Sequence, residues 1–189
     1  MIRIISGSLR GRRLVTPPGL AVRPTSDRVR TALFNILGAW LAGRRVLDLF
    51  AGAGGVGFEC LSRGAAHVTF VESSHAARAC LSQNAAALGV HDRITVLPAD
   101  TARAIPSLRG QTFDFIFADP PYRDADVPAL LAMLHAAALA GPASVCVIEH
   151  AQPRLFAPDT CHQGWRCYRT ARYGKTCLSF FDLLPTESA

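Results

Sequence analysis

The stretch Asp119-Pro120-Pro121-Tyr122 combines a carboxylate, a stiff turn and an aromatic ring at one point of the chain. Two prolines remove two N–H donors, so the carbonyls around them are left to accept hydrogen bonds. The Asp119 carboxylate and the Pro120 carbonyl would together hold both hydrogens of a planar amine, and Tyr122 would stack on a flat base. Positioning and electrostatics of this kind suit methyl transfer to an exocyclic NH₂. We therefore predict that Asp119, Pro120, Pro121 and Tyr122 form a catalytic loop.

A glycine-rich turn between an apolar run and a helix-like segment is a candidate cofactor site. Gly52, Gly54 and Gly57 match the pattern G-x-G-x-x-G, in which glycine lets the backbone approach a ligand at a helix N-terminus. The apolar run before the turn ends at Phe50 and contains Asp48. A carboxylate there would repel a pyrophosphate but attract the cationic amino-acid part of S-adenosylmethionine, directly or through water. The alternative role of Asp48 is that of a buried acid satisfied by backbone N–H groups.

Acidic residues accompany the ends of four successive expected strands, at positions 48, 72, 100 and 119. Ligands of open α/β sheets bind outside the carboxyl ends of the strands, so these acids should line one pocket. Glu72 is placed to accept both hydroxyls of a ribose. Asp100 has a second possible role, as the N-cap of the helix that follows it. The cofactor-binding residues that we predict are Asp48, Phe50, Gly52, Gly54, Glu72, Asp100, Thr101 and Asp119.

From residue 44 onward, strand-like and helix-like runs alternate, which predicts an α/β fold. Strands are expected at 45–50, 67–72, 93–98, 113–118 and 143–149, and helices at about 55–63, 74–88, 101–108 and 126–140. Five strands separated by helices imply a parallel sheet that is covered on both faces. Two further runs, 165–172 and 176–183, are joined by Tyr173-Gly174-Lys175 and should form an antiparallel hairpin.

The net charge of +6 comes entirely from the first 30 residues, because basic and acidic residues cancel in the rest of the chain. Two short β-like runs around residues 7–11 predict a hairpin, and residues 26–41 predict a helix with one apolar face. Arginine suits phosphates and base edges, so a nucleic-acid partner is expected, with a solvated surface as the alternative. Arg28 and Arg30 are expected to lie off the apolar face. The RNA-binding residues that we predict are Arg10, Arg12, Arg13, Arg23, Arg28 and Arg30.

The composition narrows the classes of protein to which the chain could belong. Half of the 189 residues are hydrophobic, which is typical of a globular chain. No apolar run is long enough for a transmembrane helix, and the N-terminus does not resemble a signal peptide, so a cytoplasmic protein is expected. The six cysteines form no C-x-x-C pair, so neither a metal site nor a disulfide framework is expected. Cys60, Cys80 and Cys146 should be buried as small apolar residues.

Several motifs together resemble the bacterial 16S rRNA guanine-N2 methyltransferases of the RsmD type. They are Arg3-Ile-Ile-Ser-Gly7, Gly11-Arg-Arg-Leu14, Arg23-Pro-Thr-Ser-Asp-Arg-Val-Arg30, Leu33-Phe-Asn35, Asp48-Leu-Phe-Ala-Gly52, Ser62-Arg-Gly-Ala65, Asp119-Pro-Pro-Tyr122 and Arg172-Tyr-Gly174. The sequence departs from the family at three positions. Ala53 stands where Ser or Thr is expected, Thr31 stands where an acid is expected, and Lys175 stands where the family often has an acid.

The resemblance implies a Rossmann-like class I S-adenosylmethionine-dependent methyltransferase with an N-terminal hairpin and helix. It implies a seven-stranded, mostly parallel sheet with an antiparallel last strand. The implied substrate is one guanine of 16S rRNA, in the small ribosomal subunit or in an assembly intermediate. We expect an Arg-rich RNA-binding extension at 1–42, a methyltransferase domain at 43–185, a tail at 186–189, and a monomer.

Three alternatives remain open from the residues alone. The same proline loop would serve methylation of a DNA adenine at N6 or of a protein glutamine at N5. A non-catalytic RNA-binding assembly factor would keep the arginines without using the cofactor fold. An NAD-dependent dehydrogenase fits least well, because of Asp48 and the terminal hairpin.

Overall fold

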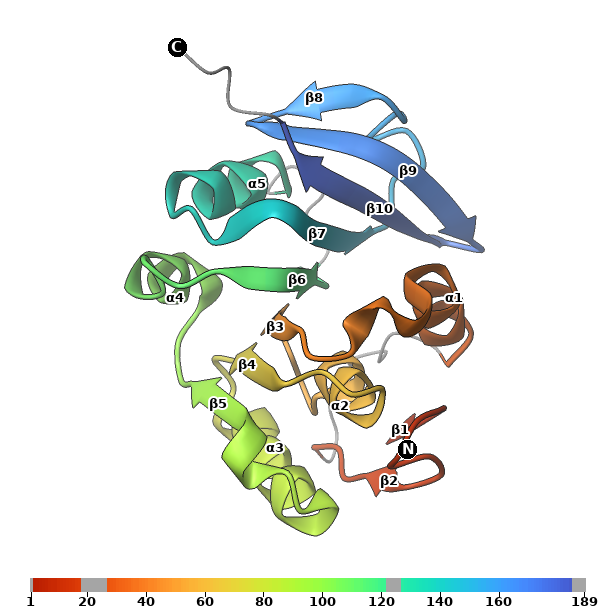
Figure 1. Ribbon diagram of the computed structural model, residues 1–189, viewed down its shortest axis with the longest axis vertical. Helices are drawn as coiled ribbons and strands as arrows, with labels where there is room; N and C mark the ends of the chain where they lie inside the picture. The colour runs from red at the N-terminus through yellow and green to blue at the C-terminus, as the bar shows by residue number, and fades with distance from the viewer. Residues whose placement is uncertain (1, 18–26, 122–126, 185–189) are drawn as a thin grey trace.

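A computed structural model describes residues 2–17, 27–121 and 127–184 of the chain. Its centre is one eight-stranded sheet in the order β5-β4-β3-β6-β7-β10-β9-β8 (Figure 1). The strands are β3 (Arg45–Leu49), β4 (His67–Val71), β5 (Ile94–Leu97), β6 (Phe113–Ala118), β7 (Ala140–His150), β8 (Thr160–His162), β9 (Trp165–Tyr173) and β10 (Thr176–Leu183). Strands β3 to β7 are mutually parallel, whereas β10 is antiparallel to both of its neighbours, β7 and β9.

This topology confirms the Rossmann-like fold that the sequence predicts, with one difference in strand number. The sheet has eight strands rather than seven, because the short β8 pairs antiparallel with the start of β9. Three residues are too few to produce an alternating pattern, so β8 gives no strand signal in the sequence. A second difference is that α5 (Val127–Ala136) ends earlier than predicted, since Ala138 adopts a left-handed φ of 52° that helices do not continue through.

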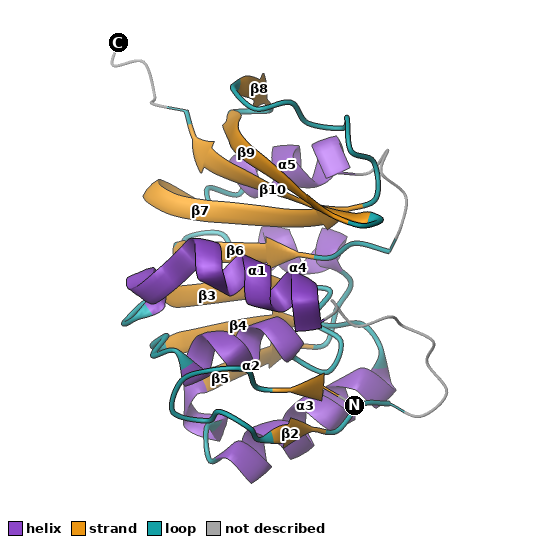
Figure 2. Cartoon of the chain, turned by 90° about the vertical axis from the view of Figure 1, so that its right-hand side faces the viewer, coloured by secondary structure: helices purple, strands orange, loops and turns teal. Residues whose placement is uncertain are grey.

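Helices cover both faces of the sheet. They are α1 (Asp27–Leu37), α2 (Gly55–Ser62), α3 (His75–Leu88), α4 (Thr101–Ser107) and α5. Short 3₁₀ turns occupy Gly38–Leu41 and His91–Arg93. Helices α1, α2 and α3 pack on one face and α4 and α5 on the other (Figure 2), and each face has its own buried apolar cluster. Cys60, Cys80 and Cys146 are buried in these clusters, as predicted. None of the helices in the described ranges is long and apolar enough to cross a bilayer.

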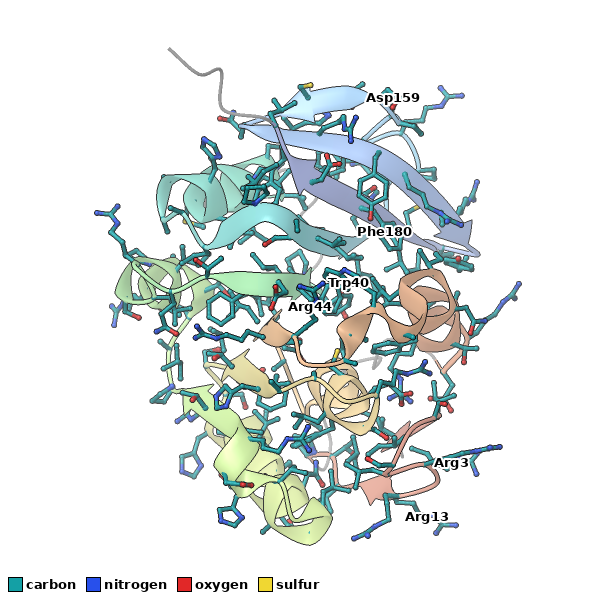
Figure 3. The ribbon with its side chains drawn as sticks, in the orientation of Figure 1. Arg3, Arg13, Trp40, Arg44, Asp159 and Phe180 are labelled. Atoms are coloured by element: carbon teal, nitrogen blue, oxygen red, sulfur yellow. The ribbon has the colours of Figure 1, made fainter. Side chains whose placement is uncertain are left out.

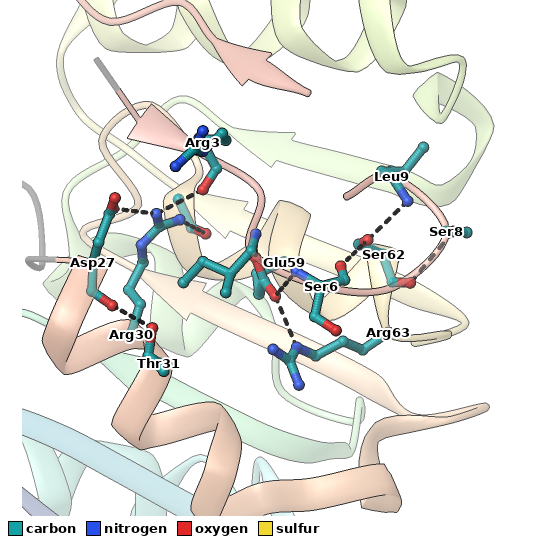
Figure 4. A network of polar contacts seen from close by, with 12 residues as sticks. Arg3, Ser6, Ser8, Leu9, Asp27, Arg30, Thr31, Glu59, Ser62 and Arg63 are labelled. Atoms are coloured by element: carbon teal, nitrogen blue, oxygen red, sulfur yellow. Dashed lines mark hydrogen bonds and ion pairs between the residues drawn. The ribbon is translucent and has the colours of Figure 1, made fainter. Parts of the chain in front are cut away.

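Residues 2–17, called the arm below, contain the predicted hairpin as β1 (Ile2–Arg3) and β2 (Arg13–Leu14), which pair antiparallel. The arm is fastened to α2 by backbone groups rather than by its arginines (Figure 4). The buried carboxylate of Glu59 accepts hydrogen bonds from the Ile5 N–H at 2.6 Å and the Ser6 N–H at 3.0 Å. Gly7 has a φ of +85°, and a Cβ there would lie 1.9 Å from the Ser62 carbonyl oxygen. The arm therefore approaches α2 too closely for any side chain at Gly7.

Arg30 corrects the prediction that both Arg28 and Arg30 are accessible for binding RNA. Its side chain is only 1 % exposed. Its guanidinium donates to the Arg3 carbonyl at 2.8 Å, to the Gly55 carbonyl at 3.0 Å and to the Asp27 carboxylate at 2.7 Å (Figure 4). Arg28, two residues earlier, is exposed. Arg30 lies off the apolar face of the helix as predicted, but the arm and α2 cover it, so it holds these elements together and is closed to phosphate.

We expect the Arg30→Met variant to lower the free energy of unfolding by about 2–4 kcal/mol, because it leaves buried carbonyl acceptors without donors. The loss should come from the two carbonyl contacts, since Asp27 is 64 % exposed and its ion pair is screened. Urea denaturation measures the change. The matched Arg28→Met variant should stay within about 0.5 kcal/mol of the wild type. Equal stability of the two variants would contradict the role of Arg30.

Candidate active site

Three parallel strands end side by side at one edge of the sheet, and the predicted site residues follow them. Leu49 of β3 is in register with Val71 of β4 and with Ala118 of β6. Glu72 and Asp119 therefore emerge on either side of the turn that follows β3. The structure thus brings the predicted acids to the carboxyl edge of the sheet, where ligands of such folds bind.

Asp48 lies beneath this edge and is only 2 % exposed. Its Oδ2 accepts a hydrogen bond of 2.9 Å from the Gly57 N–H, in the first turn of α2. Burial raises the pKa of the Asp48 carboxyl well above its usual range, the Gly57 bond opposes this, and the nearby charges of Asp119 and Glu72 raise the pKa further. Asp48 therefore has the alternative role that the sequence allowed, that of a buried acid satisfied by a backbone N–H, and it holds the glycine turn in place. When it is ionised, Asp48 adds a third negative charge to a site that already holds two other carboxylates.

Glu72 organises the turn from the other side. Its Oε2 accepts from the Gly52 N–H at 2.8 Å, and its Oε1 accepts from the Ser74 N–H at 2.7 Å. An ionised carboxylate has about four acceptor positions, so both oxygens keep capacity for further donors. A Cβ at Gly52 would meet nothing within 4 Å, so the space in front of this residue is open. Glu72 is thus held in one orientation beside open space.

Two further glycines near the turn, Gly54 and Gly57, are required by packing. Gly54 has a φ of 84° and is the N-cap residue of α2, and a Cβ there would lie 2.5 Å from the Phe58 ring. A Cβ at Gly57 would lie 2.2 Å from the Phe70 ring of β4. Phe50 adopts a left-handed φ of 60°, which is rare for an aromatic residue and costs backbone strain. The chain therefore reverses direction sharply at this turn, and α2, which follows it, packs closely against β4.

Asp100 and Thr101 follow β5, which is the outer parallel strand. Asp100 Oδ1 accepts from the Arg103 N–H at 2.9 Å, so Asp100 is the N-cap of α4, as the alternative role predicted. The Asp100 carboxylate remains exposed, whereas Thr101 is buried at the start of the helix. Asp100 therefore keeps acceptor capacity at the carboxyl edge.

The proline loop begins directly after β6. Asp119 and Pro120 are half-buried and Pro121 is exposed. Tyr122 lies outside the described residues. The loop therefore starts between the end of β3 and the end of β7, since β6 pairs with both strands.

The sequence reasoning missed two side chains that tie the arm to the glycine turn. Besides Arg30, buried Asn84 of α3 donates through Nδ2 to the Ala53 carbonyl at 3.1 Å and the Val15 carbonyl at 3.0 Å. Its Oδ1 accepts from the Val15 N–H at 2.7 Å. The signal for Asn84 is an amide in an otherwise alanine-rich helical run, where asparagine has a poor intrinsic preference.

Four of the predicted RNA-binding arginines, Arg10, Arg12, Arg13 and Arg28, are exposed. Arg12 also donates to the Ala87 carbonyl. Figure 3 shows Arg3 and Arg13 extending outward from the two-stranded sheet. Arg23 lies outside the described residues. Within the described ranges, no group of histidine, cysteine and acidic side chains could hold a metal ion.

Comparisons with known proteins agree with this geometry. A family model described as "Conserved hypothetical protein 95" matches residues 2–182. The protein "Putative rRNA methyltransferase YlbH" of Bacillus subtilis is 38% identical over 151 residues, which cover 79% of this chain and 82% of the relative. "Ribosomal RNA small subunit methyltransferase D" of Escherichia coli is 40% identical over 122 residues, covering 65% of this chain and 61% of the relative.

A solved structure matches the chain over nearly its whole length. "Putative methyltransferase yhhF from Escherichia coli" superposes with a TM-score of 0.85 at 31% identity, covering 98% of this chain and 99% of that chain. The similarity therefore includes the arm as well as the sheet. Together with the family match, this shows that the chain belongs to the Conserved hypothetical protein 95 family, the RsmD-type family whose motifs its sequence carries.

Proposed function

We propose that this protein is an S-adenosylmethionine-dependent methyltransferase that acts on the exocyclic N2 amine of a guanine in 16S rRNA of the small ribosomal subunit. The observation that carries the proposal is the placement of Asp119 and Pro120 beside the carboxylates of Asp48 and Glu72, around a glycine turn. The names of the similar proteins, which include an rRNA small subunit methyltransferase, support the class of substrate. The choice of guanine N2 rests on the motif resemblance.

The residues present fit a cofactor that carries positive charge. Three carboxylates surround the glycine turn, and their mutual repulsion contributes to the raised pKa of Asp48. A sulfonium and an ammonium group would relieve this repulsion, whereas a pyrophosphate would add to it. Glu72 has acceptor capacity left for two ribose hydroxyls. When bound, the cofactor supplies the methyl group that is transferred.

The proline loop holds the acceptor amine. The Asp119 carboxylate accepts one hydrogen of the guanine NH₂ and the Pro120 carbonyl accepts the other, which shifts electron density to the nitrogen and orients its lone pair. Tyr122 stacks on the base, which must leave its helix to expose the amine. No covalent intermediate is needed, since the chain lowers the barrier by positioning and electrostatics.

Transfer of a labelled methyl group tests the proposal. Small subunits and assembly intermediates from a strain that lacks the gene are incubated with the protein, and the modified nucleoside is identified by mass spectrometry. We expect N2-methylguanosine at one position of 16S rRNA. DNA and a glutamine-bearing protein substrate are assayed in parallel. Label in N6-methyladenine or in N5-methylglutamine would contradict the proposal. Failure of the protein to bind S-adenosylmethionine in calorimetry would instead favour the non-catalytic assembly factor.

We expect the Asp119→Asn variant to lower the rate of methyl transfer by about 10²–10³-fold, because the amine loses a charged hydrogen-bond acceptor. Single-turnover kinetics at saturating cofactor measures the loss. Calorimetry should find that cofactor affinity falls by at most about tenfold, since Asp119 is one of the three carboxylates around the glycine turn. The control is Asp92→Asn, which changes an exposed acid at the opposite edge of the sheet and should leave the rate unchanged. Full activity of the Asp119 variant would remove this residue from the mechanism.

The Asp48→Asn variant separates the two roles of this acid. The amide oxygen of the variant still accepts from the Gly57 N–H, but the charge is gone, so cofactor affinity should fall by on the order of tenfold.

The free energy of unfolding of the variant should instead rise relative to that of the wild type. The unfolded chain releases the Asp48 proton near the ordinary pKa of about 3.9, and the folded chain releases it at higher pH. Between these values the native state binds more protons, so the wild type loses stability as pH rises.

The variant lacks this titration. We therefore expect its stability, relative to the wild type, to rise from about pH 4 up to the raised pKa and then to level off. Thermal unfolding across pH measures the difference, and calorimetry measures the cofactor affinity. A constant difference in stability at all pH values would show that Asp48 is not protonated preferentially in the folded state.

The exposed arginines of the arm should hold RNA phosphates. We expect the Arg10→Gln/Arg13→Gln variant to bind small subunits more weakly and to lower the slope of log K against log salt by about 1–2. Cofactor affinity should not change. An unchanged salt slope would place the arm outside the RNA interface.

A further inference from the structure

The hairpin β9–β10 carries a second concentration of positive charge. Residues 160–183 contain Arg166, Arg169, Arg172 and Lys175 but a single carboxylate, Asp182. Arg166 is paired with Asp182, through Nε at 3.0 Å and Nη2 at 2.5 Å. Among the described residues, the other three cations have no ion-pair partner. The excess charge of this hairpin therefore lies in its other half, away from the Arg166–Asp182 pair.

That half ends at the carboxyl edge of the sheet, near the proline loop. Ala118 of β6 is in register with Ile148 of β7, and His150 of β7 is in register with Cys177 of β10. The β9–β10 turn, residues 173–176, therefore projects past the end of β7. Since neighbouring strands lie about 4.8 Å apart, β10 is roughly 10 Å from β6, whose end leads into Asp119.

The cations of this turn are exposed and at least one is held in place. Arg172 Nε donates to the Gly174 carbonyl at 3.0 Å. Among the described residues, neither terminal nitrogen of this exposed guanidinium has a hydrogen-bond partner, so both can donate to an anion. Arg172 and Lys175 are both exposed. A third exposed cation, Arg169, lies over the Phe180 ring, 5.9 Å from its centroid. Fixing Arg172 before binding reduces the entropy that is lost when a phosphate binds.

The turn and the arm lie on opposite sides of the candidate site. Figures 1 and 2 place α1 between the β9–β10 hairpin and the two-stranded sheet of the arm. The Arg30 contact with the Gly55 carbonyl fixes the first turn of α1 at the same edge, so exposed Arg28 lies there too. A polyanion that crosses this edge would meet cations before and after the proline loop.

We propose that Arg172 and Lys175 bind phosphates of the substrate RNA, so that the arm and the β9–β10 turn hold the strand at two points that flank Asp119. This inference rests on the proposed function and deepens it. Two anchors bracket the methylated guanine and fix the part of the strand from which the base leaves its stack. The hairpin therefore contributes to RNA binding, and it has no part in cofactor binding.

The test compares two variants with equal loss of charge. Arg172→Gln/Lys175→Gln removes the turn cations, and Arg45→Gln/Arg109→Gln removes two exposed arginines at the amino edge of the sheet. Binding to small subunits and to protein-free 16S rRNA is measured over a range of salt concentrations. We expect the turn variant to lower the salt slope by about 1–2 and the control to leave it near the wild-type value. KM for the subunit should rise, while kcat and cofactor affinity remain unchanged.

The outcomes separate this inference from the proposed function. A wild type that neither binds nor methylates small subunits would overturn both. A wild type that methylates, with a turn variant whose salt slope equals that of the control, would overturn the hairpin proposal alone. Weaker binding to subunits with unchanged binding to protein-free rRNA would also overturn it, because the hairpin would then contact a ribosomal protein. The charge-retaining Arg172→Lys/Lys175→Arg variant should keep the wild-type slope, which excludes misfolding as the cause.

Discussion

The guanidinium of Arg30 lies where the arm, α1 and the glycine turn meet, and it donates to a carbonyl of the arm and to a carbonyl at the start of α2. Asn84 makes the equivalent connection from α3, between Val15 of the arm and Ala53 of the turn. Because buried polar groups need partners, neither element can shift without leaving several of them unsatisfied. The surface proposed to hold RNA and the turn proposed to hold the cofactor are therefore one rigid unit. Their relative position is fixed before either ligand arrives.

Much of the fold could be predicted because its strands and helices have strong local patterns. The apolar runs of β3 and β6 and the order of the strands and helices are sufficient to predict a parallel sheet with a terminal hairpin. The strand β8 and the early end of α5 could not be predicted in the same way. The first depends on pairing with β9, and the second depends on the left-handed backbone of Ala138, a conformation that alanine does not favour.

The candidate site was predictable to the extent that topology determines it. Residues that follow parallel strands share one edge, so the positions of Glu72 and Asp119 follow from the strand assignments. The orientation of side chains is a different matter. Helical periodicity places Arg30 away from the sheet, but only the three-dimensional packing shows that the arm covers it. The net charge of the sequence does not reveal the basic turn at Arg172. The charges of residues 31–189 cancel in total, although they are unevenly distributed along the chain.

The attachment of the arm also determines when it can fold. The Ile5–Glu59 and Val15–Asn84 bonds join residues 54 and 69 positions apart. A pair of two-residue strands does not persist without such support, so the arm becomes ordered only after α2 and α3, which follow it in the chain. Until α3 has been synthesised, the arginines of the arm belong to an unfolded basic peptide, whose attraction to nucleic acid is unselective. Any selectivity of this segment for its RNA is thus acquired only when a helix encoded more than sixty residues later has formed.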